Sequence, residues 1–325
     1  MEKLLRREVE LHLKERIIEW KHLNNSGSTN ASFFATTVSG KSYTVKYNYL
    51  CKTTLQQRII RTIIDGETKH VFPKLRCSYI SLSFPFRVCF ITEWLEGKPL
   101  DISNLNSNLN ELYNCVSEVS QKLKTVHSAK ITVGLKARSL KNDYKKALRT
   151  IKQHHIDIPH LAEFIACIDA NINDCNLPAV AVVHFDFHPG NIIKTEDGYR
   201  VVDLETICIA ETWRDLAYAT EIHVPEQHRF WFLFLLAYFD GGIPEEFYKT
   251  SKIYVLVYML MLAKQNRNTG WNIYLNLVNT VYSDYNALHS NKPNWMIKTA
   301  MELYENAELS KESFRSIIES DVNGE

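Results

Sequence analysis

The sequence predicts an α+β fold of two lobes, a small β-rich N-terminal lobe and a larger helical C-terminal lobe. Short runs rich in β-branched and aromatic residues fill the first part of the chain, whereas apolar residues at helical spacing dominate from about residue 98 onward. At 325 residues the chain is long enough for two lobes that each bury a core. We therefore predict an N-terminal domain of residues 1–97 and a C-terminal domain of residues 98–325.

The N-terminal lobe is expected to open with a helix followed by a loop. Apolar residues in positions 1–20 fall on one stripe of a helix: Leu5, Val9, Leu13 and Ile17. Residues 22–32 are polar and include a glycine, which predicts a loop.

Strands are expected after this loop. The strand-like runs are residues 33–37, 43–47, 77–82 and 87–92. Ser39-Gly40-Lys41 separates the first two runs and predicts a hairpin turn. Residues 55–64 have the mixed spacing of a short helix, and Gly66 is placed to end it.

The C-terminal lobe is expected to be helical, with one β-like island. The periodic stretches are residues 112–126, 144–151, 160–172 and most of the chain after residue 229. The β-like runs of the island are residues 180–183, 192–193 and 199–204. The densest polar chemistry of the chain lies in this island.

Charge and hydropathy exclude several classes of protein. The net charge is +1 and the pI is near 7.6, which gives no reason to expect a nucleic-acid partner or an anionic membrane surface. The longest apolar runs, residues 230–239 and 253–263, fall far short of the roughly 20 residues that cross a bilayer, so they are expected to be buried helices. The charged N-terminus lacks the apolar core of a signal peptide.

The seven cysteines are scattered and form no C-x-x-C pair. This pattern argues against a disulfide framework and against a zinc ribbon. We expect a cytoplasmic protein. The sequence does not define its oligomeric state.

The island carries an ordered set of polar side chains. Residues 181–206 read AVVHFDFHPGNIIKTEDGYRVVDLET and contain His184, Asp186 and Asn191, followed by Asp203. The β-branched segments on either side place these groups at strand ends and in a loop, not on a solvated helix.

This set supplies the parts that phosphoryl transfer requires. The reaction needs an acceptor hydroxyl in line with the γ-phosphate, a metal ion that offsets phosphate charge, and a carboxylate that accepts the hydroxyl proton. Mg²⁺ prefers oxygen ligands and keeps several waters. Asp186 is therefore predicted to be the catalytic base, while Asn191 and Asp203 are predicted to hold the metal.

The spacing His184-x-Asp186-x-x-x-x-Asn191 resembles the catalytic loop of the aminoglycoside phosphotransferase and choline kinase family, and more distantly that of protein kinases. The resemblance implies a two-lobed protein-kinase-like fold. It also implies that His184 braces the loop and that Asp203 is the metal-binding aspartate. The family motif is commonly H-G-D-x-H-P-G-N, and this chain has Phe185 where glycine is usual. The phenylalanine is expected to change packing against the loop more than its chemistry.

Residues 88–100, VCFITEWLEGKPL, resemble the hinge segment of the same family. The family pattern is a hydrophobic strand followed by E-x-h-x-G. By this resemblance, the backbone of Glu93, Trp94 and Leu95 is expected to form hydrogen bonds with adenine.

Two further segments resemble the family in the expected order. Residues 43–46, YTVK, resemble the strand that bears the phosphate-contacting lysine, here Lys46. Residues 212–217, TWRDLA, resemble the family's W-D-L-A segment with one residue inserted. Asp215 is therefore expected to stabilise the catalytic loop from a following helix.

The loop before the Lys46 strand is predicted to cover the phosphates of the nucleotide. It reads NNSGSTNAS over residues 24–32, and its Gly27 allows close approach of the backbone, with Asn30 beside it. A kinase normally pairs its phosphate-contacting lysine with a glutamate from the next helix. The matching helix offers Gln57 instead, which can accept a hydrogen bond but carries no charge.

The sequence thus predicts a kinase that uses ATP and Mg²⁺ to phosphorylate a hydroxyl of an amino sugar, an amino alcohol or a related metabolite. Its expected partner is a small-molecule acceptor, with no nucleic acid and no membrane. Two alternatives stay open. One is a catalytically inactive kinase-like binding module, which Gln57 favours, and the other is a kinase whose acceptor is a protein side chain.

Overall fold

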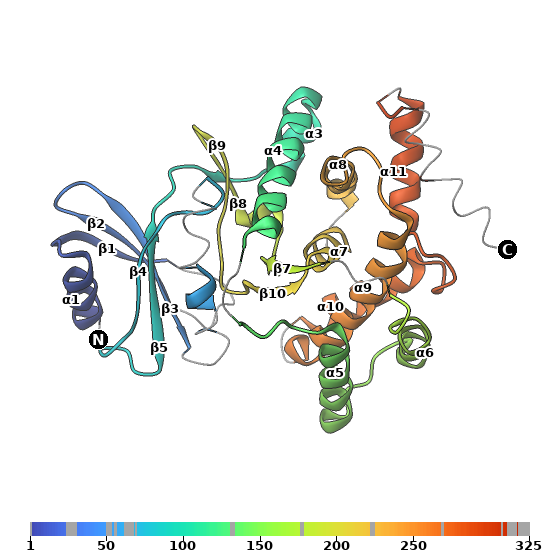
Figure 1. Cartoon of the computed structure of the whole chain (residues 1–325), viewed down its shortest axis with the longest axis horizontal. Helices are drawn as coiled ribbons and strands as arrows, with labels where there is room; N and C mark the ends of the chain where they lie inside the picture. Colours follow the sequence, from blue (N-terminus) through green and yellow to red (C-terminus); the bar gives the residue numbers. More distant parts are fainter. Residues whose placement is uncertain are drawn as a thin grey trace. The chain divides into compact units, whose positions relative to one another are not determined.

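The computed structural model describes residues 2–23, 31–49, 54, 57–61, 68, 70–130, 134–175, 179–221, 225–267, 270–306, 308–310 and 317 (Figure 1). The chain divides into two compact units. The first comprises residues 1–100, 125–135 and 189–208, and the second comprises residues 101–124, 136–188 and 209–325. Nucleotide binding by residues 1–97 and acceptor binding by residues 98–325 remain predictions.

The first unit is built on a five-stranded antiparallel sheet (Figure 1). Its strands are β1 (Ile17–Leu23), β2 (Ala31–Thr37), β3 (Ser42–Tyr49), β4 (Leu75–Ile80) and β5 (Arg87–Glu93), in the order β1-β2-β3-β5-β4. The predicted hairpin turn joins β2 and β3, where Gly40 adopts a left-handed φ of +80°. The strand predictions for this sheet are confirmed, apart from shifts of a few residues at the ends and the unpredicted β1.

The predicted helix over residues 1–20 is too long. Helix α1 spans Glu2–Leu13, and Lys14 then takes a left-handed φ of 57°, which turns the chain away from the helix axis. Ile17 starts β1, and its N–H donates to the Glu10 carboxylate at 2.8 Å. Ile17, which fits the helical spacing, is therefore buried as expected, but it lies in a strand and not in the helix. Residues 22–23 and 31–32, predicted as loop, also belong to strands.

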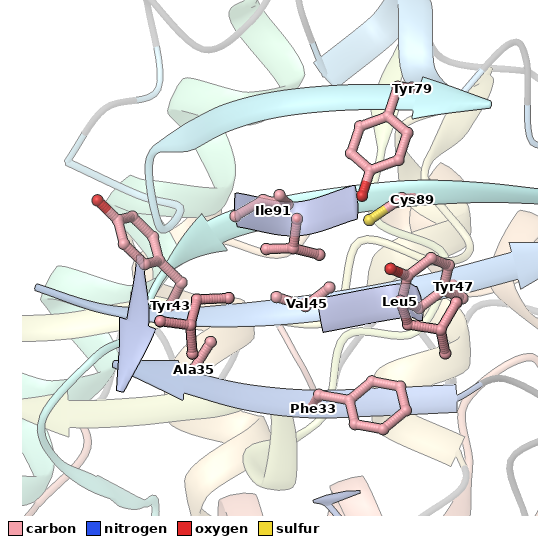
Figure 2. Close-up of a cluster of buried hydrophobic side chains, with 11 residues drawn as sticks. Leu5, Phe33, Ala35, Tyr43, Val45, Tyr47, Tyr79, Cys89 and Ile91 are labelled. Atoms are coloured by element: carbon pink, nitrogen blue, oxygen red, sulfur yellow. The ribbon is translucent and has the colours of Figure 1, made fainter. Parts of the chain in front are cut away.

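One face of this sheet forms the core of the first unit (Figure 2). The buried cluster contains Leu5, Val9, Ile17, Phe33, Ala35, Tyr43, Val45, Tyr47, Tyr79, Cys89 and Ile91, so α1 contributes side chains to the same core. Successive strand residues point to opposite faces. Because Val45 and Tyr47 point into the core, Lys46 points to the other face of the sheet.

A second, smaller sheet in the first unit carries the later part of the polar island, from residue 189 onward, whereas residues 180–188 belong to the second unit. It has the strand order β6-β8-β9, with β6 at Lys98–Pro99, β8 at Ile192–Thr195 and β9 at Gly198–Val201. The 3₁₀ turn η1 (Pro189–Asn191) leads into β8. Gly97 lies so close to β8 that a Cβ atom there would be 2.3 Å from the Lys194 carbonyl oxygen. Only glycine allows this approach of the hinge segment to the island.

The second unit is mainly helical. Its elements are α3 (Ile102–Asn106), α4 (Leu109–Ser128, the last turn of which falls in the first unit), α5 (Leu140–His154), α6 (Leu161–Asn171), α7 (Trp213–Glu221), η2 (Pro225–Gln227), α8 (His228–Tyr238), α9 (Glu245–Asn266), α10 (Trp271–Asp284) and α11 (Asn294–Glu305). Strands β7 (Val180–Val183) and β10 (Cys208–Glu211) pair with each other.

Helix α9 is the centre of the second unit, because α5, α6, α7 and α10 all pack against it. It is buried around most of its circumference, as is α8. The two apolar runs that were expected to be buried helices lie in α8 and α9, so this prediction is confirmed. No helix within the described ranges has the length and the apolar character of a membrane span.

Candidate active site

In the first unit, Lys46 meets two carboxylates from the polar island. Its ammonium group lies 2.9 Å from Asp203 Oδ1 and 3.2 Å from Glu205 Oε1. These residues are far apart in sequence, and the folded sheet brings them together. Asp203 adopts a left-handed φ of 62°, a conformation that costs free energy for a residue other than glycine and that clusters at functional sites.

Asn191 is tied to the strand segment that leads to Asp203. It ends η1, and its carbonyl oxygen accepts a hydrogen bond from the Val202 N–H at 2.8 Å. Asn191 is 7% exposed. This backbone bond ties together the segments just before β8 and just after β9, which carry the two predicted metal ligands.

The predicted metal ligands suit a hard divalent cation. Both offer oxygen, one from the Asn191 amide and one from the Asp203 carboxylate, and Mg²⁺ takes oxygen ligands together with water. The Asp203 side chain is 33% exposed, which leaves room for water and for phosphate oxygens. The residues present therefore fit magnesium.

The hinge segment is anchored by backbone hydrogen bonds. The Glu93 N–H donates to the Lys74 carbonyl at 3.0 Å, and the Trp94 N–H donates to the Ser42 carbonyl at 3.0 Å. Both donors are thus engaged within the first unit. The predicted adenine contacts would have to come from the Leu95 N–H or from carbonyl groups of this segment.

Gln57 contacts the segment that carries one of the two acidic partners of Lys46. Gln57 is 5% exposed, and its side-chain amide donates to the backbone carbonyl of Glu205. Gln57 therefore fixes the backbone that presents the Glu205 carboxylate. Gly27 and Asn30, predicted to lie in a phosphate-covering loop, fall outside the described residues.

In the second unit, a buried carboxylate holds the predicted catalytic loop. Asp215 is 1% exposed and accepts hydrogen bonds from the His184 N–H at 2.7 Å and from the Phe185 N–H at 2.5 Å. Asp215 lies in the first turn of α7, where the helix dipole favours a negative charge. The predicted role of Asp215 as a brace for this loop is confirmed.

His184 also shapes this loop. It is fully buried, and its Nδ1 accepts a hydrogen bond from the Asp186 N–H at 3.3 Å. The Asp186 side chain is 46% exposed, with His188 Nε2 at 3.9 Å from its Oδ2. The backbone of the loop is therefore buried and hydrogen-bonded, while the Asp186 carboxylate is accessible. A general base requires this arrangement.

Phe185 stands where the family motif commonly has glycine, and its surroundings show how the chain accommodates the larger residue. Its φ is 67°, the left-handed region that glycine adopts without strain. The ring is nevertheless buried, with the Arg138 guanidinium 4.1 Å from its centroid and the Tyr218 ring packed edge-on at 5.2 Å. Cation–π and edge-to-face contacts offset the backbone strain. The chain thus keeps the glycine conformation and fills the space with an aromatic ring.

Two residues near these sites were not predicted from the sequence. One is Glu205, described above. The other is Tyr258 in α9, which stacks on Tyr218 at 4.2 Å. Burial, together with the nearby negative charge of Asp186, raises the pKa of Tyr258 to about 12, although Arg138 acts in the opposite direction. Tyr258 therefore stays neutral at physiological pH and lies within electrostatic reach of the predicted base.

Comparison with known proteins gives a family match. The model of the phosphotransferase enzyme family APH matches residues 23–246 of the chain. No curated protein sequence matches the chain significantly. The match covers the Lys46 strand, the hinge, the catalytic loop and α7, and it confirms the family that the sequence motifs indicated.

Three solved structures illustrate the likeness in fold. The spectinomycin phosphotransferase APH(9)-Ia in complex with ADP and spectinomycin has a TM-score of 0.60 and 13% identity, and the alignment covers 91% of this chain and 98% of that one. The amicoumacin kinase hAmiN in complex with AMP-PNP, Ca²⁺ and Ami has a TM-score of 0.61 and 10% identity, with coverage of 90% and 95%. The choline kinase LicA from Streptococcus pneumoniae has a TM-score of 0.59 and 15% identity, with coverage of 88% and 99%.

These likenesses extend over nearly the whole of each chain and confirm the predicted α+β, protein-kinase-like fold. The nucleotides and the divalent cation in two of those structures agree with the predicted use of ATP and a divalent metal.

Proposed function

Because this chain belongs to the phosphotransferase enzyme family, we propose that it transfers the γ-phosphate of ATP to a hydroxyl group of an amino sugar, an amino alcohol or a related small metabolite. The family fixes the class of enzyme, a small-molecule phosphotransferase that acts on alcohol groups. The acceptor and the roles of individual residues are our proposal.

The observation that carries the proposal is the pairing of Lys46 with Asp203 at 2.9 Å. Phosphoryl transfer needs a cation from the protein beside the phosphates and a carboxylate that holds a metal at the same phosphates. In this chain Lys46 comes from β3 and Asp203 from the segment just after β9, and the two groups meet directly. A chance loop with the same motif would not bring them together.

The proposed roles follow from the chemistry of each side chain. Lys46 contacts the phosphate oxygens of the nucleotide, and Asn191 and Asp203 hold Mg²⁺. The metal, when bound, offsets the negative charge that the phosphate oxygens carry during transfer. Asp186 orients the acceptor hydroxyl and accepts its proton, a role worth about 10²–10⁴-fold in rate.

The loop around Asp186 supports its proposed role as base. The two N–H groups bound by Asp215 and the contact with His184 fix the backbone on which the carboxylate stands. A positioned base is effective because it need not be reorganised during each turnover.

The nature of the acceptor is the finer part of the proposal. The similar structures are named for spectinomycin, amicoumacin and choline, all small molecules. This range supports a small-molecule acceptor, and it includes both an antibiotic and an amino alcohol. A cytoplasmic setting also remains our proposal, and the free thiols of Cys77, Cys89, Cys167 and Cys175 suit a reducing compartment.

The inactive-module alternative loses its sequence support. It rested on Gln57, which leaves the neighbouring helix without an acidic partner for Lys46. Since Glu205 places a carboxylate 3.2 Å from the Lys46 ammonium, the charge that the helix lacks is present from another segment.

Magnesium-dependent ATP turnover against a panel of amino sugars and amino alcohols tests the proposal. We expect turnover with at least one acceptor, and we expect Asp203→Ala to abolish it because a metal ligand is lost. The matched control is Asp197→Ala, which removes an exposed carboxylate from the β8–β9 turn and should leave turnover unchanged. Equal turnover in Asp203→Ala and in the wild type would refute the metal assignment.

A further inference from the structure

We propose that Glu205 is the positioning partner of Lys46 and performs the task that a helix glutamate performs in related kinases. The inference rests on the proposed function, because it assumes that Lys46 contacts the nucleotide phosphates. It concerns a residue that lies just after the Asp203 motif.

The geometry places Lys46 between two carboxylates. Asp203 Oδ1 lies 2.9 Å from its ammonium group and Glu205 Oε1 lies 3.2 Å away. The side chains of Lys46 and Glu205 are 20% and 22% exposed. An ion pair that is mostly withdrawn from water is screened less than one on the open surface. The pair is thus strong enough to restrict where the ammonium points.

Asp203 is unsuited to remain the sole partner of Lys46. In the proposed reaction its carboxylate binds the divalent cation, and a carboxylate bound to such a cation has less negative charge to share with a lysine. Glu205 then becomes the carboxylate that holds Lys46 toward the phosphates. Lysine has a flexible four-carbon stem, so an unheld ammonium would sample many positions.

The neighbouring helical segment supports Glu205 instead of pairing with Lys46 itself. Gln57 is buried, and its amide donates to the backbone carbonyl of Glu205. This bond fixes the chain at the residue that carries the carboxylate. The helix therefore still contributes to positioning Lys46, but through the backbone of Glu205 and without a charge of its own.

A double-mutant cycle between Lys46 and Glu205 tests the inference. The variants are Glu205→Gln, Lys46→Met and the pair combined, and the readouts are ADP affinity by calorimetry in the presence of Mg²⁺ and kcat/KM for ATP. We expect Glu205→Gln to weaken ADP binding about tenfold when Lys46 is present. With Lys46→Met in the background, the same change should have less than a twofold effect, because a positioning residue acts only through its partner.

Two further variants complete the experiment. Glu205→Asp keeps the carboxylate but shortens the side chain by one methylene. Its ADP affinity should therefore lie between those of the wild type and Glu205→Gln. This difference should appear only when Lys46 is present. Glu196→Gln is the control, since it removes an exposed glutamate from the β8–β9 turn, and it should bind ADP as the wild type does. Glu205→Asp also serves as the test if Glu205→Gln does not fold.

Two results would overturn the inference: equal losses in both backgrounds, or wild-type ADP affinity in Glu205→Gln. The ADP-binding arm needs no acceptor. If no acceptor is phosphorylated but the cycle shows coupling, the proposed reaction fails while the role of Glu205 stands.

Discussion

The two sets of candidate catalytic residues, one in each unit, are held in place by different means. In the first unit, Lys46, Asp203 and Glu205 are partly exposed side chains that hold one another by ion pairs. In the second unit, the Asp186 loop is held by hydrogen bonds from its backbone to a buried carboxylate and by packed aromatic rings.

This difference matches the tasks proposed for the two parts. Groups that bind phosphate and metal must exchange one partner for another, and Lys46 can keep its ion pair with Glu205 while Asp203 exchanges the ammonium for another partner. A catalytic base must instead keep one position through each turnover, which favours a fixed backbone. The comparison predicts that substitutions of the residues that hold the Asp186 loop lower the free energy of unfolding more than substitutions in the first unit do.

The largest effect on stability is expected for Asp215→Ala. The change leaves the buried N–H groups of His184 and Phe185 without an acceptor, at a cost of about 3–5 kcal/mol in the free energy of unfolding. Urea denaturation measures this loss. The control, Asp240→Ala, removes an aspartate whose side chain is 86% exposed and pairs with Lys124, so it should cost less than about 1 kcal/mol. Equal losses in the two variants would show that the Asp215 hydrogen bonds do not support the loop.

Phe185→Gly should have a smaller effect, because two contributions oppose each other. Glycine relieves the left-handed strain, worth about 1–2 kcal/mol, while loss of the buried ring costs about 3–5 kcal/mol. We expect a net destabilisation of about 2–3 kcal/mol by urea denaturation. Phe185→Ala loses the ring but keeps the strain, so it should be less stable than Phe185→Gly. The opposite order would mean that the φ of this residue carries no strain.

Gly97→Ala is expected to have the smallest effect of the three. Its new Cβ atom would be 2.3 Å from the Lys194 carbonyl oxygen, so the hinge segment must shift, at a cost of about 1–3 kcal/mol. The matched control is Gly134→Ala, also in the first unit, where a Cβ atom has nothing within 4 Å. Thermal unfolding compares the two variants. If both unfold at the wild-type temperature, β6 and β8 do not depend on this close approach.

The sequence predicts those elements whose pattern is local. The hairpin around Gly40 and the strands of the polar island follow from β-branched residues and a turn signal that lie together in the chain. The end of α1 could not be predicted from apolar spacing, because Ile17 fits a helical stripe and a strand equally well. The left-handed turn at Lys14 decides between them.

The missed site residues depend on contacts between distant segments. The helix after the Lys46 strand offers only the uncharged Gln57 to Lys46, and no local signal favours Glu205, which approaches from the polar island. Tyr258 lies in the apolar run of α9, where its spacing is that of a core residue. Its proximity to Asp186 arises only when α7 and α9 pack together and Tyr218 stacks on Tyr258.

The central claim is that Asp186 is the base of a phosphoryl transfer to a small molecule. Single-turnover transfer by Asp186→Asn, measured beside ADP binding, tests it most directly, with the exposed Asp174→Asn as control. The account predicts that transfer falls by about 10²–10⁴-fold while ADP binding stays at the wild-type level, because the base acts on the acceptor hydroxyl. Full activity of Asp186→Asn on every acceptor would contradict it.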